Sequence, residues 1–160
     1  MSKNIIIGFR KFAYDFIFKL YDNHIPVENI DKATVFETCY ITTATIKNNK
    51  ISKPKISNRE SDFCNIKQRV RNYNTVILMS DDTCDLADAI RGLIFNHGDD
   101  DSPLIKKCIA ITTQRQRIKH SGWFYHVIKN NNVLQVNGDN YTCDEVLNFI
   151  KEKTGNENAK

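Results

Sequence analysis

The sequence has few glycines and prolines and no long apolar run. It contains six glycines and three prolines, and the glycines are too scattered to form a phosphate-binding loop or a dinucleotide fingerprint. No apolar stretch approaches the roughly 20 residues that span a bilayer, and the first residues lack the pattern of a signal peptide. We therefore predict a cytoplasmic protein with no membrane partner.

Patterns typical of metal and nucleophile chemistry are also missing. The five cysteines are an odd number, widely spaced and without a Cys-x-x-Cys pair, so we expect reduced thiols packed in the core. The four histidines form no His-x-His or His-x-x-x-His pair, Asp99 to Asp101 lacks the alternating ligands of a calcium loop, and there is no Gly-x-Ser-x-Gly elbow. We predict no metal site and no tightly bound cofactor.

The net charge of +4 is small for 160 residues, which permits anionic partners without requiring them. One basic segment, Gln114 to His120, lies beside the aromatic run Trp123 to Tyr125. Such a combination can bind single strands by charge and stacking. We interpret it as a solvated loop followed by core aromatics, and predict that nucleic acid is not a partner.

What the chain does contain is an alternation of buried-strand and helical patterns. Short β-branched runs predict strands, and apolar residues at helical spacing predict helices between them. The predicted strands cover 4–9, 33–40 with a continuation through 46, 75–79 and 107–112, with a late strand or hairpin over 124–136 turned at 130–132; the predicted helices cover 10–23, 61–70, 83–98 and a C-terminal segment capped by Thr142.

This alternation requires right-handed crossovers and therefore a mostly parallel sheet. We predict one α/β domain over 1–154 with an open, flavodoxin-like sheet and helices on both faces, followed by a frayed tail at 155–160. The stretch from Lys47 to Glu60 is rich in Lys and Asn and poor in apolar residues, which predicts an exposed, mobile loop.

Ligands of open parallel sheets collect beyond the carboxyl ends of the strands. Polar loops at Glu37 to Tyr40 and Thr113 to Arg117 follow predicted strands, but the segment after the strand 75–79 is the most informative. Its carboxylates and hydroxyls can bind a magnesium ion or ribose hydroxyls, or simply cap the next helix. The predicted nucleotide-binding residues are Phe9, Arg10, Ser80, Asp81, Asp82 and Thr83.

Arg10 is unusual because a cation is disfavoured at the start of a helix. Two compensating groups are open: a protein carboxylate such as Asp81, which we favour, or a ligand phosphate.

The layout resembles the TIR-like domains of bacterial antiphage systems, in particular the small TIR-like proteins of Thoeris defence. The resemblance rests on Ile5-Ile6-Ile7-Gly8-Phe9 with its helix, on Val35-Phe36-Glu37, on Asn74 to Thr83, and on the strand Cys108 to Thr112. It implies a TIR-like fold in which NAD is a substrate and not a resident cofactor. It further implies cleavage of the nicotinamide–ribose bond to give an ADP-ribose-derived signal.

In that family a glutamate on the helix after the third strand stabilises the reacting ribose. The register that aligns Thr83 with the family places Gly92 at the position of this glutamate. Asp85 and Asp88 lie on the same predicted helix and are the candidate catalytic carboxylates, although they also fit its solvated face.

Two other functions stay open. The first is a non-catalytic interaction module of the same fold that binds a protein partner or self-associates. The second is a small nucleic-acid-processing protein that uses Asp81, Asp82 and the segment from Arg115 to Lys119.

Overall fold

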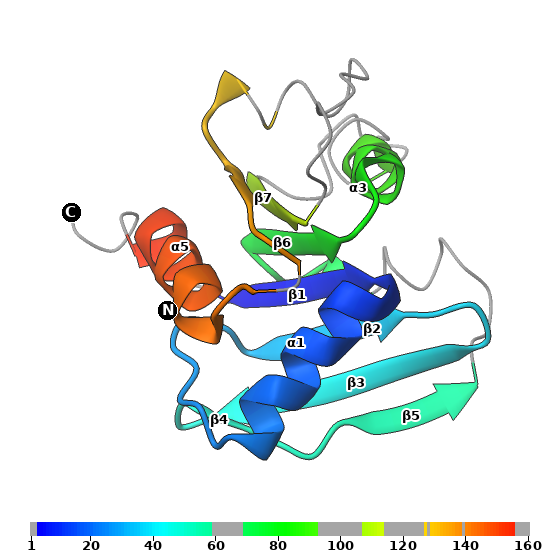
Figure 1. Cartoon of the computed structure of the whole chain (residues 1–160), viewed down its shortest axis with the longest axis vertical. Coiled ribbons are helices and arrows are strands. Elements are labelled where there is room, and N and C mark those ends of the chain that lie inside the picture. The colour runs from blue at the N-terminus through cyan, green and yellow to red at the C-terminus, as the bar shows by residue number, and fades with distance from the viewer. Residues whose placement is uncertain are drawn as a thin grey trace.

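The computed structural model describes residues 3–58, 69–92, 107–113, 127, 129–138 and 140–155, and Figure 1 shows their arrangement. The strands are β1 (Asn4–Phe9), β2 (Lys32–Phe36), β3 (Tyr40–Lys47), β4 (Lys50–Ile51), β5 (Lys55–Asn58), β6 (Thr75–Ser80), β7 (Lys107–Thr112) and β8 (Val133–Gln135), and the helices are α1 (Arg10–Asp22), α3 (Thr83–Ile90) and α5 (Cys143–Gly155).

All eight strands join one sheet in the order β4-β3-β2-β1-β6-β7-β8, with β5 pairing to β3. The pairs β2–β1, β1–β6, β6–β7 and β7–β8 are parallel, whereas β3 is antiparallel to β2, β4 and β5. The predicted α/β class with a mostly parallel sheet is confirmed. When only the parallel strands β1, β2, β6, β7 and β8 are numbered 1 to 5 in chain order, their order across the sheet is 2-1-3-4-5. This is the order of flavodoxin-like sheets.

Helices cover both faces of the parallel part, as predicted. On one face Ile6, Ile77 and Ile109 pack in a common core with residues of α1 and α5. On the other face Ile7 and Leu78 pack with residues of α3. Because neighbouring strand residues point to opposite faces, a strand covered on both sides must be apolar throughout. This explains the continuous apolar runs of β1 and β6.

The turn from β1 into α1 is tight. A Cβ atom placed on Gly8 would lie 2.3 Å from the Cβ of Ala13 in α1, so only glycine lets the helix return this closely over the strand. Arg10, the first residue of α1, has a φ of 69°, in the left-handed region that side chains other than glycine seldom adopt. The chain therefore holds its first helix start in a strained conformation.

Several other predicted elements are confirmed. The helix that begins at Arg10 buries Phe12, Phe16, Ile17 and Leu20 as expected, and the strands β6 and β7 occupy the predicted residues. Thr142 caps α5, since its Oγ1 accepts a hydrogen bond from the amide of Glu145 at 3.1 Å.

The region between β2 and β6 differs from the prediction. The predicted strand 33–46 is two strands, because the chain reverses at residues 37–39 and β3 returns antiparallel to β2. The predicted loop from Lys47 to Glu60 is exposed for most of its described length, but it contains the strands β4 and β5. Both lie at the sheet edge, so they need few apolar residues and give no strand pattern.

Of the late strand or hairpin predicted over 124–136, a strand is confirmed at Val133–Gln135 (β8), but the hairpin is wrong. Val127 and Lys129 are helical, and β8 runs parallel to β7. The expectation of core cysteines holds for Cys108, while Cys39 and Cys84 are exposed and Cys143 is half-buried. Residues 59–68, 93–106 and 114–126 lie outside the described part, as do Cys64, the start of the helix predicted at 61, the end of the helix predicted to reach 98, and the tail after Gly155.

Candidate functional site

The predicted site residues meet at the carboxyl ends of β1 and β6. These two strands are adjacent and parallel, with Phe9 opposite Ser80 at their ends. From here α1 packs on one face of the sheet and α3 on the other. This divergence is the topological switch point at which open α/β sheets bind ligands. The structure therefore brings the turn after β1 beside the segment 80–85.

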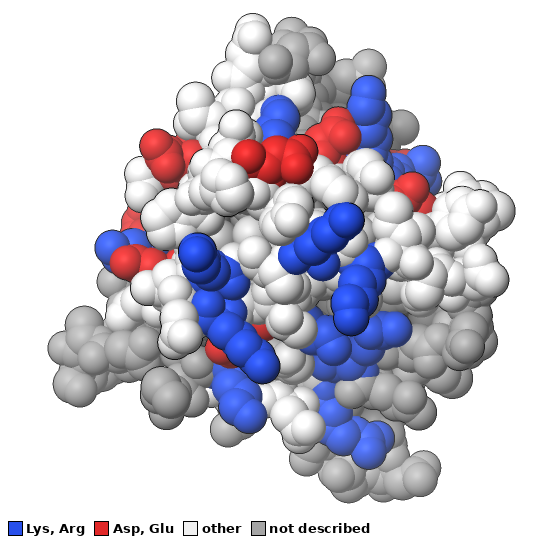
Figure 2. All heavy atoms as spheres, turned by 90° about the horizontal axis from the view of Figure 1, so that it is seen from below, with Lys and Arg blue, Asp and Glu red and all other residues white. Residues whose placement is uncertain are grey.

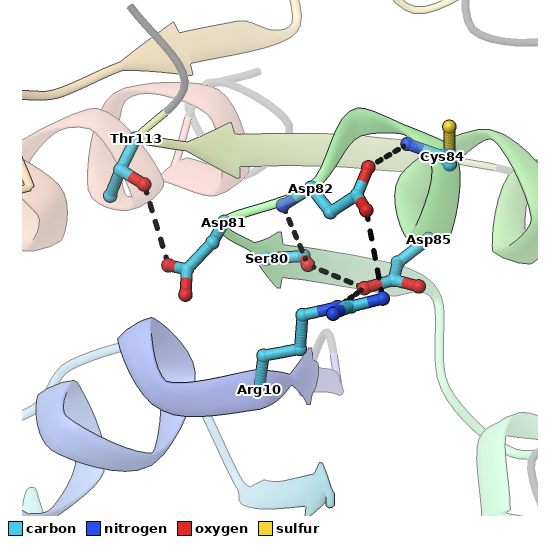
Figure 3. Close-up of polar contacts among 7 residues, drawn as sticks. All are labelled: Arg10, Ser80, Asp81, Asp82, Cys84, Asp85 and Thr113. Atoms are coloured by element: carbon cyan, nitrogen blue, oxygen red, sulfur yellow. Dashed lines mark hydrogen bonds and ion pairs between the residues drawn. The ribbon is translucent and has the colours of Figure 1, made fainter.

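Arg10 joins the two turns (Figure 3). Its Nε lies 2.6 Å from Oδ2 of Asp85, and its Nη2 lies 3.6 Å from Oδ2 of Asp82. The Oγ of Ser80, which is fully buried, donates to the same Oδ2 of Asp85 at 2.9 Å. The hydrogen bond and the charge of Asp85 raise the pKa of Arg10. Asp85 is thus held by Arg10 and by Ser80 at the carboxyl ends of β1 and β6.

The polar segment also caps α3. Asp82 is the N-cap residue, and its Oδ1 accepts from the amide of Cys84 at 2.8 Å. The Oγ of Ser80 accepts from the amide of Asp82 at 3.1 Å. Thr83 is the first residue of α3 and is buried. The capping alternative is therefore confirmed for Asp82, whose other carboxylate oxygen faces Arg10.

Asp81 points to the other side of the turn, toward α1 and β7. It accepts hydrogen bonds from the Phe12 amide and from Oγ1 of Thr113 at 3.4 Å. The N-cap position of α1 supplies no side-chain acceptor of its own. The carboxylate of Asp81, in the turn after β6, therefore accepts a hydrogen bond from an amide of the first turn of α1 in its place. Burial raises the pKa of Asp81, partly offset by those two hydrogen bonds.

The prediction that a protein carboxylate neutralises Arg10 is confirmed, with Asp85 and Asp82 in place of Asp81. Asp88, the second candidate catalytic carboxylate, is exposed and lies one turn further along α3 than Asp85. Phe9 stacks on Phe36 with ring centroids 5.8 Å apart, so its ring packs on β2 beside the turn from β1 into α1.

Tyr141 is a site residue that the sequence analysis did not identify. Its ring packs against Phe12 at a centroid distance of 5.1 Å. Its hydroxyl is buried without a hydrogen-bond partner among the described residues. Burial raises the pKa of Tyr141, and the charges of Cys143, Asp15 and Asp81 raise it further. Nothing in the sequence around residue 141 connects it to Phe12, because only the fold brings α5 beside α1.

The charges of the site are unbalanced. Three carboxylates, those of Asp81, Asp82 and Asp85, surround one guanidinium, that of Arg10. The excess of negative charge disfavours a phosphate at this position. It suits hydroxyl donors such as those of ribose, or a centre that carries positive charge.

Within the described ranges, no group of three or more His, Cys, Asp or Glu residues has the arrangement of a metal site. No helix in the same ranges is long and apolar enough to cross a membrane. The residues from Gln114 to Lys119, proposed from sequence for nucleic-acid processing, lie outside the described part.

Comparison with known proteins finds none that is similar to this chain. No family model matches the chain, and neither the curated proteins nor the solved structures contain a significant match.

Proposed function

We propose that the chain is a flavodoxin-like, TIR-like protein that binds NAD at the carboxyl ends of β1 and β6 and cleaves its nicotinamide–ribose bond. The ADP-ribose-derived product is the nucleotide signal that the resemblance to antiviral defence proteins implies. The observation that carries the proposal is the placement of Asp85 at the switch point of the sheet, fixed by Ser80 and Arg10.

The proposed reaction needs a fixed negative charge. The bond between ribose C1′ and the nicotinamide nitrogen breaks, its electron pair leaves with nicotinamide, and C1′ becomes positively charged. A carboxylate held in place before the reaction stabilises such a centre without reorganisation. The oxygen of water, or of a hydroxyl of the same nucleotide, then bonds to C1′ and releases its proton. Asp85 is the carboxylate that we assign to this step.

Of the remaining polar groups, one binds the substrate and another holds the catalytic carboxylate in place. The carboxylate of Asp82 is 39% exposed and can accept hydrogen bonds from ribose hydroxyls while it caps α3. Arg10, 58% exposed, orients Asp85. Asp88, which lies one helical turn beyond Asp85 along α3, is the alternative catalytic carboxylate.

The test is nicotinamide release from NAD by the purified chain, with thermal shifts in NAD and ADP-ribose as a second readout. We expect release by the wild type and a loss of about a hundredfold or more in Asp85→Asn, the scale on which one stabilising group acts. Asp144→Asn, at an exposed position of α5, is the charge-matched control and keeps the wild-type rate.

Asp88→Asn decides which carboxylate acts. If this variant loses activity and Asp85→Asn does not, the assignment passes to Asp88. If the wild type releases no nicotinamide and shows no thermal shift with either nucleotide, the proposal is wrong.

A specific observation also favours the second candidate, a non-catalytic interaction module. Asp85 is already neutralised by Arg10 at 2.6 Å, and Gly92, at the position of the family's glutamate, is buried and carries no carboxylate. Such a module would assemble with itself or bind a protein partner. Concentration-dependent assembly that persists in Asp85→Ala and Asp88→Ala, without nicotinamide release, would support it, whereas an inert monomer would contradict it.

A further inference from the structure

The antiparallel part of the sheet collects lysines on one face. Along β3, Thr43, Thr45 and Lys47 alternate with buried residues and share one side of the strand. Directly opposed residues of neighbouring strands point to the same face of a sheet. The partners of these three positions therefore extend the same face onto the adjacent strands.

Three of the four partner positions are lysines. Lys32 of β2 is opposite Thr45, Lys50 of β4 is opposite Lys47, and Lys55 of β5 is opposite Thr43. The fourth, Thr34 of β2, is opposite Thr43 and is buried. We name these four side chains, those of Lys32, Lys47, Lys50 and Lys55, the lysine face. Three of them are exposed and Lys32 is half-buried.

No acidic residue occurs anywhere from 38 to 58 in the sequence. Figure 2 looks onto this edge of the molecule and shows Lys and Arg side chains gathered across it, with acidic side chains mainly toward the upper rim. None of the ion pairs between described residues involves the lysine face. Among the described residues, the lysine face therefore carries positive charge that no ion pair compensates.

Protection of a sheet edge explains the lysine face only in part. Lysines on edge strands prevent pairing with other chains, which accounts for those of β4 and β5. Lys32, however, is on β2, which has β1 and β3 on its two sides. Lys47 and Lys50 are directly opposed, and like charges opposed across strands are destabilising. An anion bound over the face would relieve this repulsion.

We infer that the lysine face binds the sugar–phosphate backbone of a nucleic-acid duplex, without reading its sequence. Lysines make mobile point-charge contacts with phosphates, and hydroxyls such as those of Thr43 and Thr45 supplement them. The described residues of the face include no aromatic side chain, so base stacking with a single strand lacks a platform.

The register also argues against insertion into a bilayer. Tyr40 and Ile56 are the exposed large hydrophobic residues of the described part, at 49% and 54% exposure. Ile56 is opposite Thr42, and Tyr40 is two residues before Thr42 on β3, so both belong to the opposite face of the sheet. The lysines therefore lack the apolar neighbours that would enter lipid.

The inference is independent of the proposed function and revises the prediction that nucleic acid is not a partner. That prediction looked for basic residues and aromatics close together in sequence. The lysine face is built across four strands, so its charges converge only after the sheet has formed.

The test is fluorescence anisotropy of a labelled DNA duplex of random sequence over a series of NaCl concentrations. The wild type should bind with a logarithmic salt slope of about −0.9 for each phosphate contacted. The variant K47Q/K50Q/K55Q should lose affinity by about tenfold or more at low salt, and its slope should be shallower by about three.

The matched control, K11Q/K129Q/K151Q, removes the same charge from exposed lysines on other elements and should retain the wild-type slope. Circular dichroism checks that both variants fold. Equal losses in the two triple variants would mean that net charge alone attracts DNA, and would overturn the inference. So would wild-type binding to phosphatidylserine vesicles without binding to the duplex, or the absence of duplex binding at low salt.

Discussion

At the scale of single residues, Asp82 has two effects on its surroundings that one substitution separates. It caps α3 through the Cys84 amide, and its charge, followed by a hydrogen bond from the thiol, raises the pKa of the exposed Cys84. Asparagine caps as well as aspartate but is neutral. In Asp82→Asn the pKa of Cys84 should fall, which increases the thiolate fraction at any given pH below it.

We therefore expect faster alkylation of Cys84 by iodoacetamide at about pH 8 in Asp82→Asn, measured on the Cys84 peptide by mass spectrometry. Far-UV circular dichroism should show an unchanged helix content. Asp22→Asn, on α1, is the control with the same loss of charge, and Cys108, whose pKa is raised by complete burial, should stay unreactive throughout. An unchanged Cys84 rate in Asp82→Asn would contradict this account of its pKa.

The same scale shows how far the site could be predicted. A cation at a helix start signals a compensating group, so a protein carboxylate beside Arg10 is predictable from the sequence. Asp81, the carboxylate nearest the end of β6, is the candidate that the sequence favours. The positive φ of Arg10 and the packing of α1 and α3 on opposite faces decide the actual partner, Asp85, and neither can be read from residue types.

At the scale of elements, Gly8 sets how closely α1 packs on β1. In Gly8→Ala the new methyl group would meet Ala13 at 2.3 Å, and both backbones are too constrained to separate easily. We expect a loss of about 1–3 kcal/mol in the free energy of unfolding, the usual cost of overpacking. Urea denaturation followed by circular dichroism measures it.

The double variant Gly8→Ala with Ala13→Gly tests whether this one contact is the cause. Ala13→Gly alone should cost about 1 kcal/mol from helix propensity. Because it removes the opposing methyl group, the double variant should be more stable than the sum of the two single losses predicts. Strict additivity would show that Gly8 matters for another reason.

Elements were predictable where burial leaves a pattern. Strands β1 and β6 are covered on both faces, so they are continuously apolar, and the helix α1 keeps its apolar stripe. The turn at 37–39 contains no Gly, Pro or Asn, so nothing in the sequence announces that β2 and β3 are separate strands. Val127 is itself β-branched and follows closely on three aromatic residues, Trp123 to Tyr125, yet it is helical, which shows that tertiary context overrides β-propensity.

At the scale of the whole molecule, the sheet divides into a buried parallel part and an exposed antiparallel part. Every residue of β6 is buried, whereas every residue of β5 is exposed. The candidate nucleotide site is at the carboxyl end of the first part, and the lysine face belongs mainly to the second. Local stability should follow this division, because exposed backbone with few apolar contacts opens at low free energy.

Hydrogen–deuterium exchange followed by mass spectrometry measures this division directly. Peptides from β1 and β6 should exchange last, through global unfolding, and those covering β4 and β5 should exchange much earlier through local opening. Addition of the DNA duplex should slow exchange in β4, in β5 and at the ends of β2 and β3 that carry Lys32 and Lys47, since the bound backbone restrains only the lysine face. NAD should instead protect the turns after β1 and β6. Exchange of β5 as slow as that of β6 in the free protein would mean that the antiparallel strands belong to the same cooperative unit as the parallel core.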